Sequence, residues 1–161
     1  MEKQFLIRPA QPADAGELMR LIRALADYEK LSGMCVGTPE MLREALFGAR
    51  RSCEALMAER GGRSVGFALY FSTFSTFLCK PGLYLEDLFV EPGERGLGIG
   101  KGLLRALAAL AVERDCGRFE WSVLDWNEPA IGFYKKLGAT PMDAWKIMRV
   151  TGDALHKLAG S

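Results

Sequence analysis

A glycine-rich turn constrains this sequence more than any other feature, because residues 95–101 run Arg95, Gly96, Leu97, Gly98, Ile99, Gly100, Lys101. An apolar segment at 83–90 precedes the turn, and leucines recur at helical spacing after it, from 100 to 114. Glycine lets a backbone approach a ligand closely, and the first N–H groups of a helix lack intrahelical partners. We therefore predict a strand, a turn and a helix whose N-terminus binds an anion, with a purely structural glycine turn as the alternative.

The turn does not match the two best-known nucleotide-binding motifs. A GxxxxGK loop needs glycine where Arg95 stands, and a GxGxxG fingerprint needs glycine at Lys101 or Leu103. Glu120 lies where a ribose-binding acid might be expected, but it carries little weight without the glycine spacing. The turn therefore predicts neither a P-loop nor a dinucleotide-binding site.

Composition places the chain among ordinary globular proteins. Its 161 residues are 49% hydrophobic and 25% charged, which fits a single domain spanning residues 1–161. The net charge of +1 gives no sustained attraction to nucleic acid or to an anionic membrane. The N-terminus lacks an apolar signal region and no stretch has membrane-spanning length, so we expect a cytoplasmic location.

Patterning along the chain predicts a mixed α/β fold. Strands are expected at 5–7, 53–58, 64–71, 83–90, 119–124 and 145–150. Helices are expected from 14 to 28 or 31, after Thr38 up to Gly48, at 100–114, at 127–138 and near the C-terminus. Gly61 and Gly62 predict an antiparallel hairpin between the second and third strands, and a loop is expected from 72 to 81.

These patterns resemble a known family. Arg95, Gly98 and Gly100 match the RxxGxG signature of GNAT acetyltransferases. The stretches FLIRPA, ADYE, YLEDLFV, RGLGIGK and WNEPAIGFYKKLGA, with a later tryptophan, are similar to its diamine (spermidine/spermine) and thialysine N-acetyltransferase branch. The resemblance covers most of the chain and implies a mixed sheet that is antiparallel in its first half, splayed centrally and covered by helices on both faces.

The resemblance also implies an activity. It is direct transfer of an acetyl group from acetyl-CoA to a primary amine of a polyamine, a small diamine or a thialysine-like amino acid. The branch is commonly homodimeric and uses no metal. The hairpin at Gly61 and Gly62 is shorter than in animal diamine acetyltransferases, and the 72–81 segment differs in sequence. These departures leave the identity of the amine open.

Site residues follow from the matching positions. The resemblance implies catalytic roles for Tyr134 as the general acid and for Glu86 as the acceptor of the amine proton, directly or through water. Acetyl-CoA contacts fall to the backbone of Leu88, Phe89 and Val90, the amides of residues 95–101, Asn127 and Tyr134. Substrate contacts fall to Tyr28, Glu29, Glu86, Asp87 and Asp143.

Physical chemistry supports these roles. A primary amine has a pKa of about 10, so a group must accept its proton before it attacks a thioester. Glu86, between Leu85 and Leu88, is expected to be partly desolvated, which would raise its pKa. A tyrosine can protonate the leaving thiolate, and strand N–H groups freed by a splay can stabilise an oxyanion. The ordinary alternatives are carboxylates alternating across a sheet and Tyr134 packing on Phe133.

Other chemistries receive less support. A non-catalytic acyl-CoA sensor would have no use for Glu86 with Tyr134, and a protein or peptide N-acetyltransferase would share the chemistry with a different acceptor. The four cysteines are widely spaced without a CxxC pair, so we expect reduced thiols and no zinc site. The lone His156 lies near the C-terminus and predicts no catalytic triad, and direct transfer is preferred to an acyl-cysteine intermediate.

Overall fold

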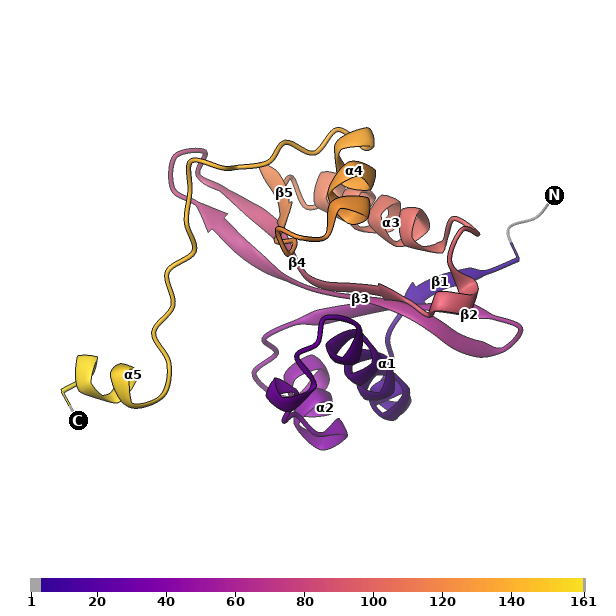
Figure 1. Ribbon diagram of the computed structural model, residues 1–161, viewed down its shortest axis with the longest axis horizontal. Helices are drawn as coiled ribbons and strands as arrows, with labels where there is room; N and C mark the ends of the chain where they lie inside the picture. Colours follow the sequence, from indigo (N-terminus) through magenta and orange to yellow (C-terminus); the bar gives the residue numbers. More distant parts are fainter. Residues whose placement is uncertain (1–3, 161) are drawn as a thin grey trace. The chain divides into compact units, whose positions relative to one another are not determined.

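The computed structural model describes residues 4–160, in which strands and helices follow each other as a mixed α/β chain (Figure 1). The strands are β1 (Leu6–Pro9), β2 (Glu54–Arg60), β3 (Arg63–Ser75), β4 (Lys80–Val90) and β5 (Arg118–Trp121). The α-helices are α1 (Ala15–Tyr28), α2 (Pro39–Phe47), α3 (Ile99–Glu113), α4 (Glu128–Lys136) and α5 (Gly152–Leu158). Short 3-10 turns occur at η1 (Pro12–Asp14), η2 (Ser32–Met34) and η3 (Pro92–Glu94). The chain divides after Ser122 into two compact units.

The first unit contains one sheet with the strands in sequence order, β1-β2-β3-β4-β5. The first three pairings are antiparallel, and only the pairing of β4 with β5 is parallel. Gly61 and Gly62 connect β2 to β3 with φ angles of 58° and 75°, the left-handed values that a two-residue hairpin requires. The predicted mixed sheet, antiparallel in its first half, is confirmed.

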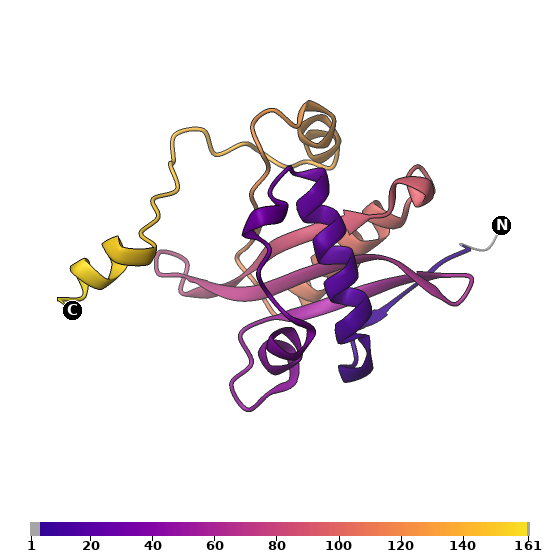
Figure 2. The same ribbon diagram turned by 60° about the horizontal axis from the view of Figure 1, so that its bottom comes forward.

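Helices cover both faces of this sheet, as predicted. Figures 1 and 2 show α1 and α2 on one face and α3 on the other. On the first face, Leu18 and Leu21 of α1 are fully buried in a cluster that includes Met57 and Phe67 of the sheet. On the second, Leu103 and Leu107 of α3 are equally buried. Apolar residues at helical spacing in these two segments therefore identified the core-facing stripe of each helix.

Two sequence-based expectations about strands were wrong. The loop expected at 72–81 is mostly strand, since β3 continues to Ser75 and β4 begins at Lys80. The extension begins beside Phe71 and Tyr84, whose ring centroids are 5.2 Å apart, and continues as strand pairing from Ser72 opposite Leu83 to Ser75 opposite Lys80. Residues 145–150 form no strand, and all of their side chains are exposed. An alternating pattern needs a neighbouring strand to receive its hydrogen bonds, and residues 123–160 contain no other strand.

The remaining boundaries follow local chemistry. The Thr38 hydroxyl accepts a hydrogen bond of 3.2 Å from the Met41 N–H, and proline occupies the next position, so α2 begins where the cap predicted. β5 ends at Trp121, three residues before the expected end at 124.

Within the described part of the chain, no helix is long and apolar enough to cross a membrane.

Candidate active site

The two central strands part halfway along their length. β4 pairs with β5 from Gly82, opposite Arg118, to Leu85, opposite Trp121. Beyond that point, residues 87–90 pair with β3, and no residue of 86–90 pairs with β5. This is the predicted splay, and it leaves one backbone edge of 86–90 without a strand neighbour in the sheet. Backbone N–H groups at such an edge are hydrogen-bond donors for a ligand.

A β-bulge places Glu86 at the start of the splay. Leu69 of β3 lies opposite Asp87, and the next residue, Tyr70, lies opposite Leu85, so Glu86 has no opposing residue on β3. A bulge of this kind bends the strand and redirects the side chains beside it. As a result, Glu86 is exposed whereas Asp87 is half-buried.

Asp87 is the desolvated carboxylate of this pair. Burial, with smaller contributions from the charges of Glu86 and Glu29, raises the pKa of Asp87 from its usual 3.8 to about 6. We expected desolvation at Glu86, and this expectation was wrong because the bulge turns Glu86 to solvent and Asp87 inward. The sequence placed both acids on a strand but could not assign which of them is buried.

The end of α1 contributes a second desolvated acid. Glu29 is the C-cap residue of α1, directly after Tyr28, and burial raises the pKa of its carboxyl. The carbonyl end of a helix carries partial negative charge, which adds to the charges of Glu29, Asp87 and Glu86. Three acids and a helix C-terminus make this region favourable for a cation.

The glycine turn forms an anion-binding helix start. Gly96 and Gly98 have φ angles of 81° and 84°, and Gly98 is the N-cap of the fifteen-residue helix α3. The Gly102 N–H donates to the Gly98 carbonyl over 2.9 Å, so the N–H groups before it precede the first helical hydrogen bond. These groups and the helix dipole suit phosphate oxygens.

Gly100 has no structural reason to be glycine. It lies in the first turn of α3, and an added Cβ would meet only the Val90 Cγ2 at an ordinary 3.9 Å. Additions at Gly96 and Gly98 would meet no atom within 4 Å. The space beside the turn is therefore open on the protein side, as a ligand that approaches the backbone requires.

Arg95 connects the turn to the end of α1. Its Nε donates to the Val90 carbonyl over 2.9 Å, and its guanidinium lies 4.9 Å from the Tyr28 ring centroid and 5.6 Å from that of Phe89. Both distances are within the range of cation–π attraction. The sequence placed Arg95 at the start of the turn, and it did not predict that Tyr28 and Phe89 hold the side chain.

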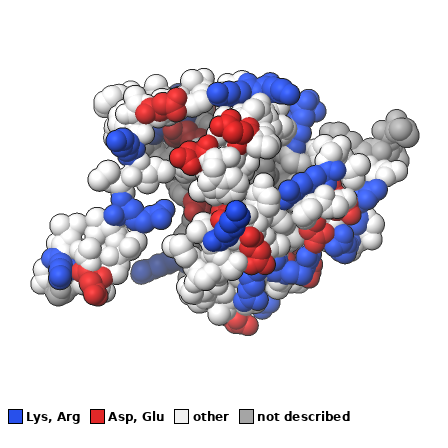
Figure 3. All heavy atoms as spheres, in the orientation of Figure 1, with Lys and Arg blue, Asp and Glu red and all other residues white. Residues whose placement is uncertain are grey.

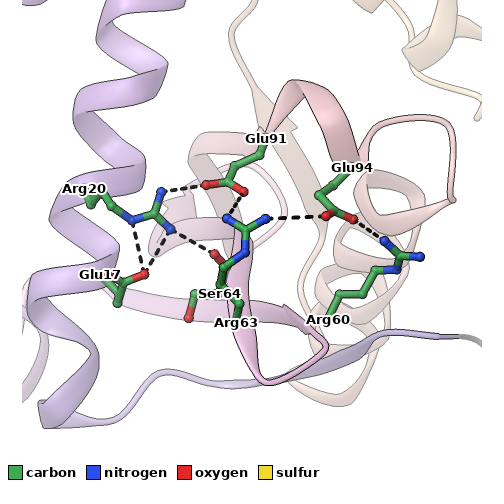
Figure 4. A network of polar contacts seen from close by, with 7 residues as sticks. All are labelled: Glu17, Arg20, Arg60, Arg63, Ser64, Glu91 and Glu94. Carbon is green, nitrogen blue, oxygen red and sulfur yellow. Dashed lines mark hydrogen bonds and ion pairs between the residues drawn. The ribbon is translucent and has the colours of Figure 1, made fainter.

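Sequence reasoning also missed Glu91 and Glu94, which lie immediately before the turn. Both carboxylates bind arginines from other elements (Figure 4). The available signal was weak: glutamates flank Pro92 and Gly93, and arginines flank the glycine hairpin between β2 and β3. Nothing in the sequence shows that these two short turns approach each other.

Three expected site residues lie in the second unit. The Asn127 side chain caps α4 by accepting a hydrogen bond of 3.4 Å from the Ala130 N–H. Tyr134 lies in α4, partly buried, with its ring centroid 5.5 Å from that of Phe133. Asp143 is exposed, in a turn that the Trp145 N–H closes on the Met142 carbonyl. Their part in the site stays a prediction.

Comparisons with known proteins show the family and the fold. The model of the acetyltransferase (GNAT) family matches residues 20–139. The chain is 39% identical over 166 residues to a thialysine N-epsilon-acetyltransferase of Sus scrofa, covering 96% of this chain and 97% of that protein. It is 46% identical over 93 residues to an L-ornithine N5-acetyltransferase of Arabidopsis thaliana, covering 58% of this chain and 41% of that protein. An integron cassette protein from the mobile metagenome of V. cholerae has a similar structure, with a TM-score of 0.84 at 27% identity, covering 99% of this chain and 100% of that one.

The burial of Asp87 gives a stability prediction. The pKa of Asp87 is about 6 in the folded protein, so ionising this carboxyl lowers the free energy of unfolding. The stability that the protonated carboxyl contributes is fully present below about pH 4 and is lost as the pH rises through 6. Asp87→Asn removes this loss. Relative to wild type, the variant should gain roughly 2 kcal/mol of unfolding free energy between pH 4.5 and pH 7.5, measured by urea unfolding. Asp125→Asn, at an exposed position, is the control, and equal pH profiles for the two variants would contradict the assignment.

Proposed function

The chain belongs to the acetyltransferase (GNAT) family, and from this premise we propose that it acetylates a primary amine of a small molecule with acetyl-CoA. The observation that carries the substrate class is the desolvated acid pair Asp87 and Glu29 beside the splay of β4. Similar proteins named for acetylating thialysine at Nε and ornithine at N5 support the same class. The proposed substrates are thialysine-like amino acids, small diamines and polyamines.

Acetyl-CoA fits the glycine turn. The amides of 95–101 would hold its pyrophosphate at the N-terminus of α3, where the space beside Gly96, Gly98 and Gly100 is open. The splayed backbone of residues 88–90 would bind the arm that carries the thioester. Asn127 is proposed to contact the same ligand from the second unit. Acetyl-CoA supplies the activated acetyl group, and the remaining steps belong to the protein.

The acids have two proposed roles, which are binding of a cationic substrate and acceptance of its proton. Asp87, Glu29 and Tyr28 are proposed to bind ammonium groups, with Asp143 assisting from the second unit. A bound cation would relieve the repulsion between the acids and return the pKa of Asp87 toward its usual range. Glu86, exposed at the bulge, is proposed to accept the proton of the reacting amine through water.

Bond formation and bond breaking then require one more proton. The amine nitrogen bonds to the acetyl carbonyl carbon, the carbon–sulfur bond breaks, and Tyr134 is proposed to protonate the leaving sulfur. Backbone N–H groups of 88–90 stabilise the negative charge that develops on the carbonyl oxygen. Direct transfer is preferred to an acyl-cysteine route. Burial raises the pKa of the Cys53 thiol, which makes this one cysteine a poor nucleophile.

An amine panel tests the reaction. Thiol release from acetyl-CoA should occur with thialysine, ornithine and short diamines but not with acetylated peptides that lack a free amine. Glu86→Gln and Tyr134→Phe should each lower kcat by about 10²–10⁴-fold, the usual range for loss of general acid–base catalysis. Glu113→Gln and Tyr84→Phe are matched controls expected to keep full activity.

The outcomes separate the alternatives. Turnover only with peptides bearing a free N-terminus would favour a peptide N-acetyltransferase. Binding of CoA without turnover on any amine would favour a non-catalytic sensor. Full activity of Tyr134→Phe across pH would remove Tyr134 as the general acid, and full activity of Glu86→Gln would transfer proton acceptance to another group.

Gly100 offers a test of the cofactor position. Gly100→Leu should leave the fold intact, because the position is helical and open, yet weaken CoA binding at least tenfold by occupying the space beside the turn. The measurement is calorimetric titration with CoA, alongside the melting temperature. Gly16→Leu, at a similarly open helical position in α1, is the control. Equal CoA affinity in both variants would exclude the turn as the pyrophosphate site.

We also propose a homodimer. Large apolar side chains of the second unit are exposed, including Trp145 (78%), Ile147 (75%) and Met148 (88%), and such surfaces mark sites of association. Light scattering should give a mass twice the 17.8 kDa of one chain. Ile147→Asp with Met148→Asp should shift the mass toward that of the monomer. A monomeric wild type at assay concentration would exclude the dimer.

A further inference from the structure

The turn that is proposed to bind acetyl-CoA is anchored just before its first residue. Between β4 and the turn, Glu91 is the N-cap of the short turn η3 and Glu94 is its last residue. Figure 4 shows both carboxylates directed at arginines from α1 and from the β2–β3 hairpin. These contacts lie within the first unit and involve no residue that the proposed reaction uses.

Glu91 joins two elements that are distant in sequence. One carboxylate oxygen accepts a hydrogen bond of 2.6 Å from Arg20 of α1, and the other accepts one of 2.7 Å from Arg63 of β3. Arg20 is itself fixed, because it also donates to the Ser64 carbonyl over 2.9 Å and to Glu17 over 3.0 Å. Glu91 is therefore held from two sides by arginines with additional partners.

Glu94 completes the link to the hairpin. It accepts a hydrogen bond of 2.9 Å from Arg60 of β2, and Arg63 reaches its other oxygen at 3.5 Å. Arg63 thereby bridges Glu91 and Glu94. Both carboxylates are well covered, with 18% and 16% of their side-chain surface exposed, whereas Arg20, Arg60 and Arg63 are 42%, 35% and 56% exposed. A single pair of this kind contributes little, so the anchor depends on the network as a whole.

The same contacts balance charge next to an anion site. Two glutamates immediately before residues 95–101 would repel a pyrophosphate, but Arg20, Arg60 and Arg63 neutralise them. Acidic and basic side chains are interspersed over the face drawn in Figure 3. A shallow depression of about 590 Å³ beside Arg20 and Arg63 is not a rival anion site, since both guanidinium groups already bind Glu91.

We propose that Glu91 and Glu94 are positioning residues that hold the 95–101 turn in the geometry that binds CoA. The turn contains two left-handed glycines and would otherwise sample many conformations, so ordering it during binding would cost affinity. Anchoring its start to α1 and to the hairpin pre-organises the backbone amides. This inference rests on the proposed use of the turn for acetyl-CoA.

The direction of the change in CoA affinity separates a positioning role from an electrostatic one. Glu91→Gln with Glu94→Gln removes two negative charges near the pyrophosphate, so electrostatics alone would tighten CoA binding. Loss of positioning would weaken it. We expect the dissociation constant of CoA to rise about tenfold in calorimetric titration, while kcat at saturating acetyl-CoA and the KM for the amine stay within about twofold.

Two further variants make the test independent of folding and of charge. Glu54→Gln is the control, because it breaks a two-bond ion pair with Arg114 (2.7 and 2.8 Å) away from the turn and should leave CoA affinity unchanged. Glu91→Asp with Glu94→Asp keeps both charges but shortens their reach. It should also weaken CoA binding several-fold, and it decides the question if the glutamine variant does not fold.

The failures are distinguishable. Unchanged or tighter CoA binding in the folded glutamine variant, or unchanged binding in the aspartate variant, would overturn the positioning role. Equal weakening in Glu54→Gln would also overturn it, because the effect would then follow from any broken ion pair. If wild type itself does not bind CoA, the proposed function fails before the positioning role is measured.

Discussion

The parting of β4 from β5 after Leu85 is the constraint on which the rest of the site depends. Up to Leu85 the strand is hydrogen-bonded on both sides, so its backbone is fully committed to the sheet. After Leu85 only β3 remains as a partner, and a bulge at Glu86 accompanies the change. One strand therefore lies between two neighbours at one end and has an open backbone edge at the other. The acids and the turn are functional candidates because they flank that transition.

The first unit contains separate regions suited to opposite charges. The turn at 95–101 and the dipole of α3 attract an anion, whereas Asp87, Glu29 and the carbonyl end of α1 attract a cation. Arg95 lies between these regions, held over the rings of Tyr28 and Phe89. An acetyl donor with an anionic pyrophosphate and an acceptor with an ammonium group match this division. The buried core beneath, centred on residues such as Phe67 and Leu103, keeps the two regions in fixed relation within the first unit.

Local patterns predicted most of the fold because they report local physics. Leucines at helical spacing, the Thr38 cap and the glycine hairpin each act over a few residues, and the corresponding helices and turn are present. The strand expected at 145–150 was wrong because a strand depends on a partner that the sequence pattern does not contain. The long hairpin of β3 and β4 was missed for a similar reason, since residues 72–75 are strand only through their pairing with residues 80–83.

The sequence by itself determined the chemistry available: a glycine turn before a helix, two adjacent acids on an apolar strand, and the motifs that resemble one acetyltransferase family. These depend on residue type and spacing, which the chain carries without folding. Only the tertiary structure decided which acid is desolvated, where Arg95 is held and how Glu91 and Glu94 are anchored. Burial, ring contacts and ion pairs each require residues far apart in sequence to meet, as Arg20 and Glu91 do, and a linear pattern does not specify that meeting.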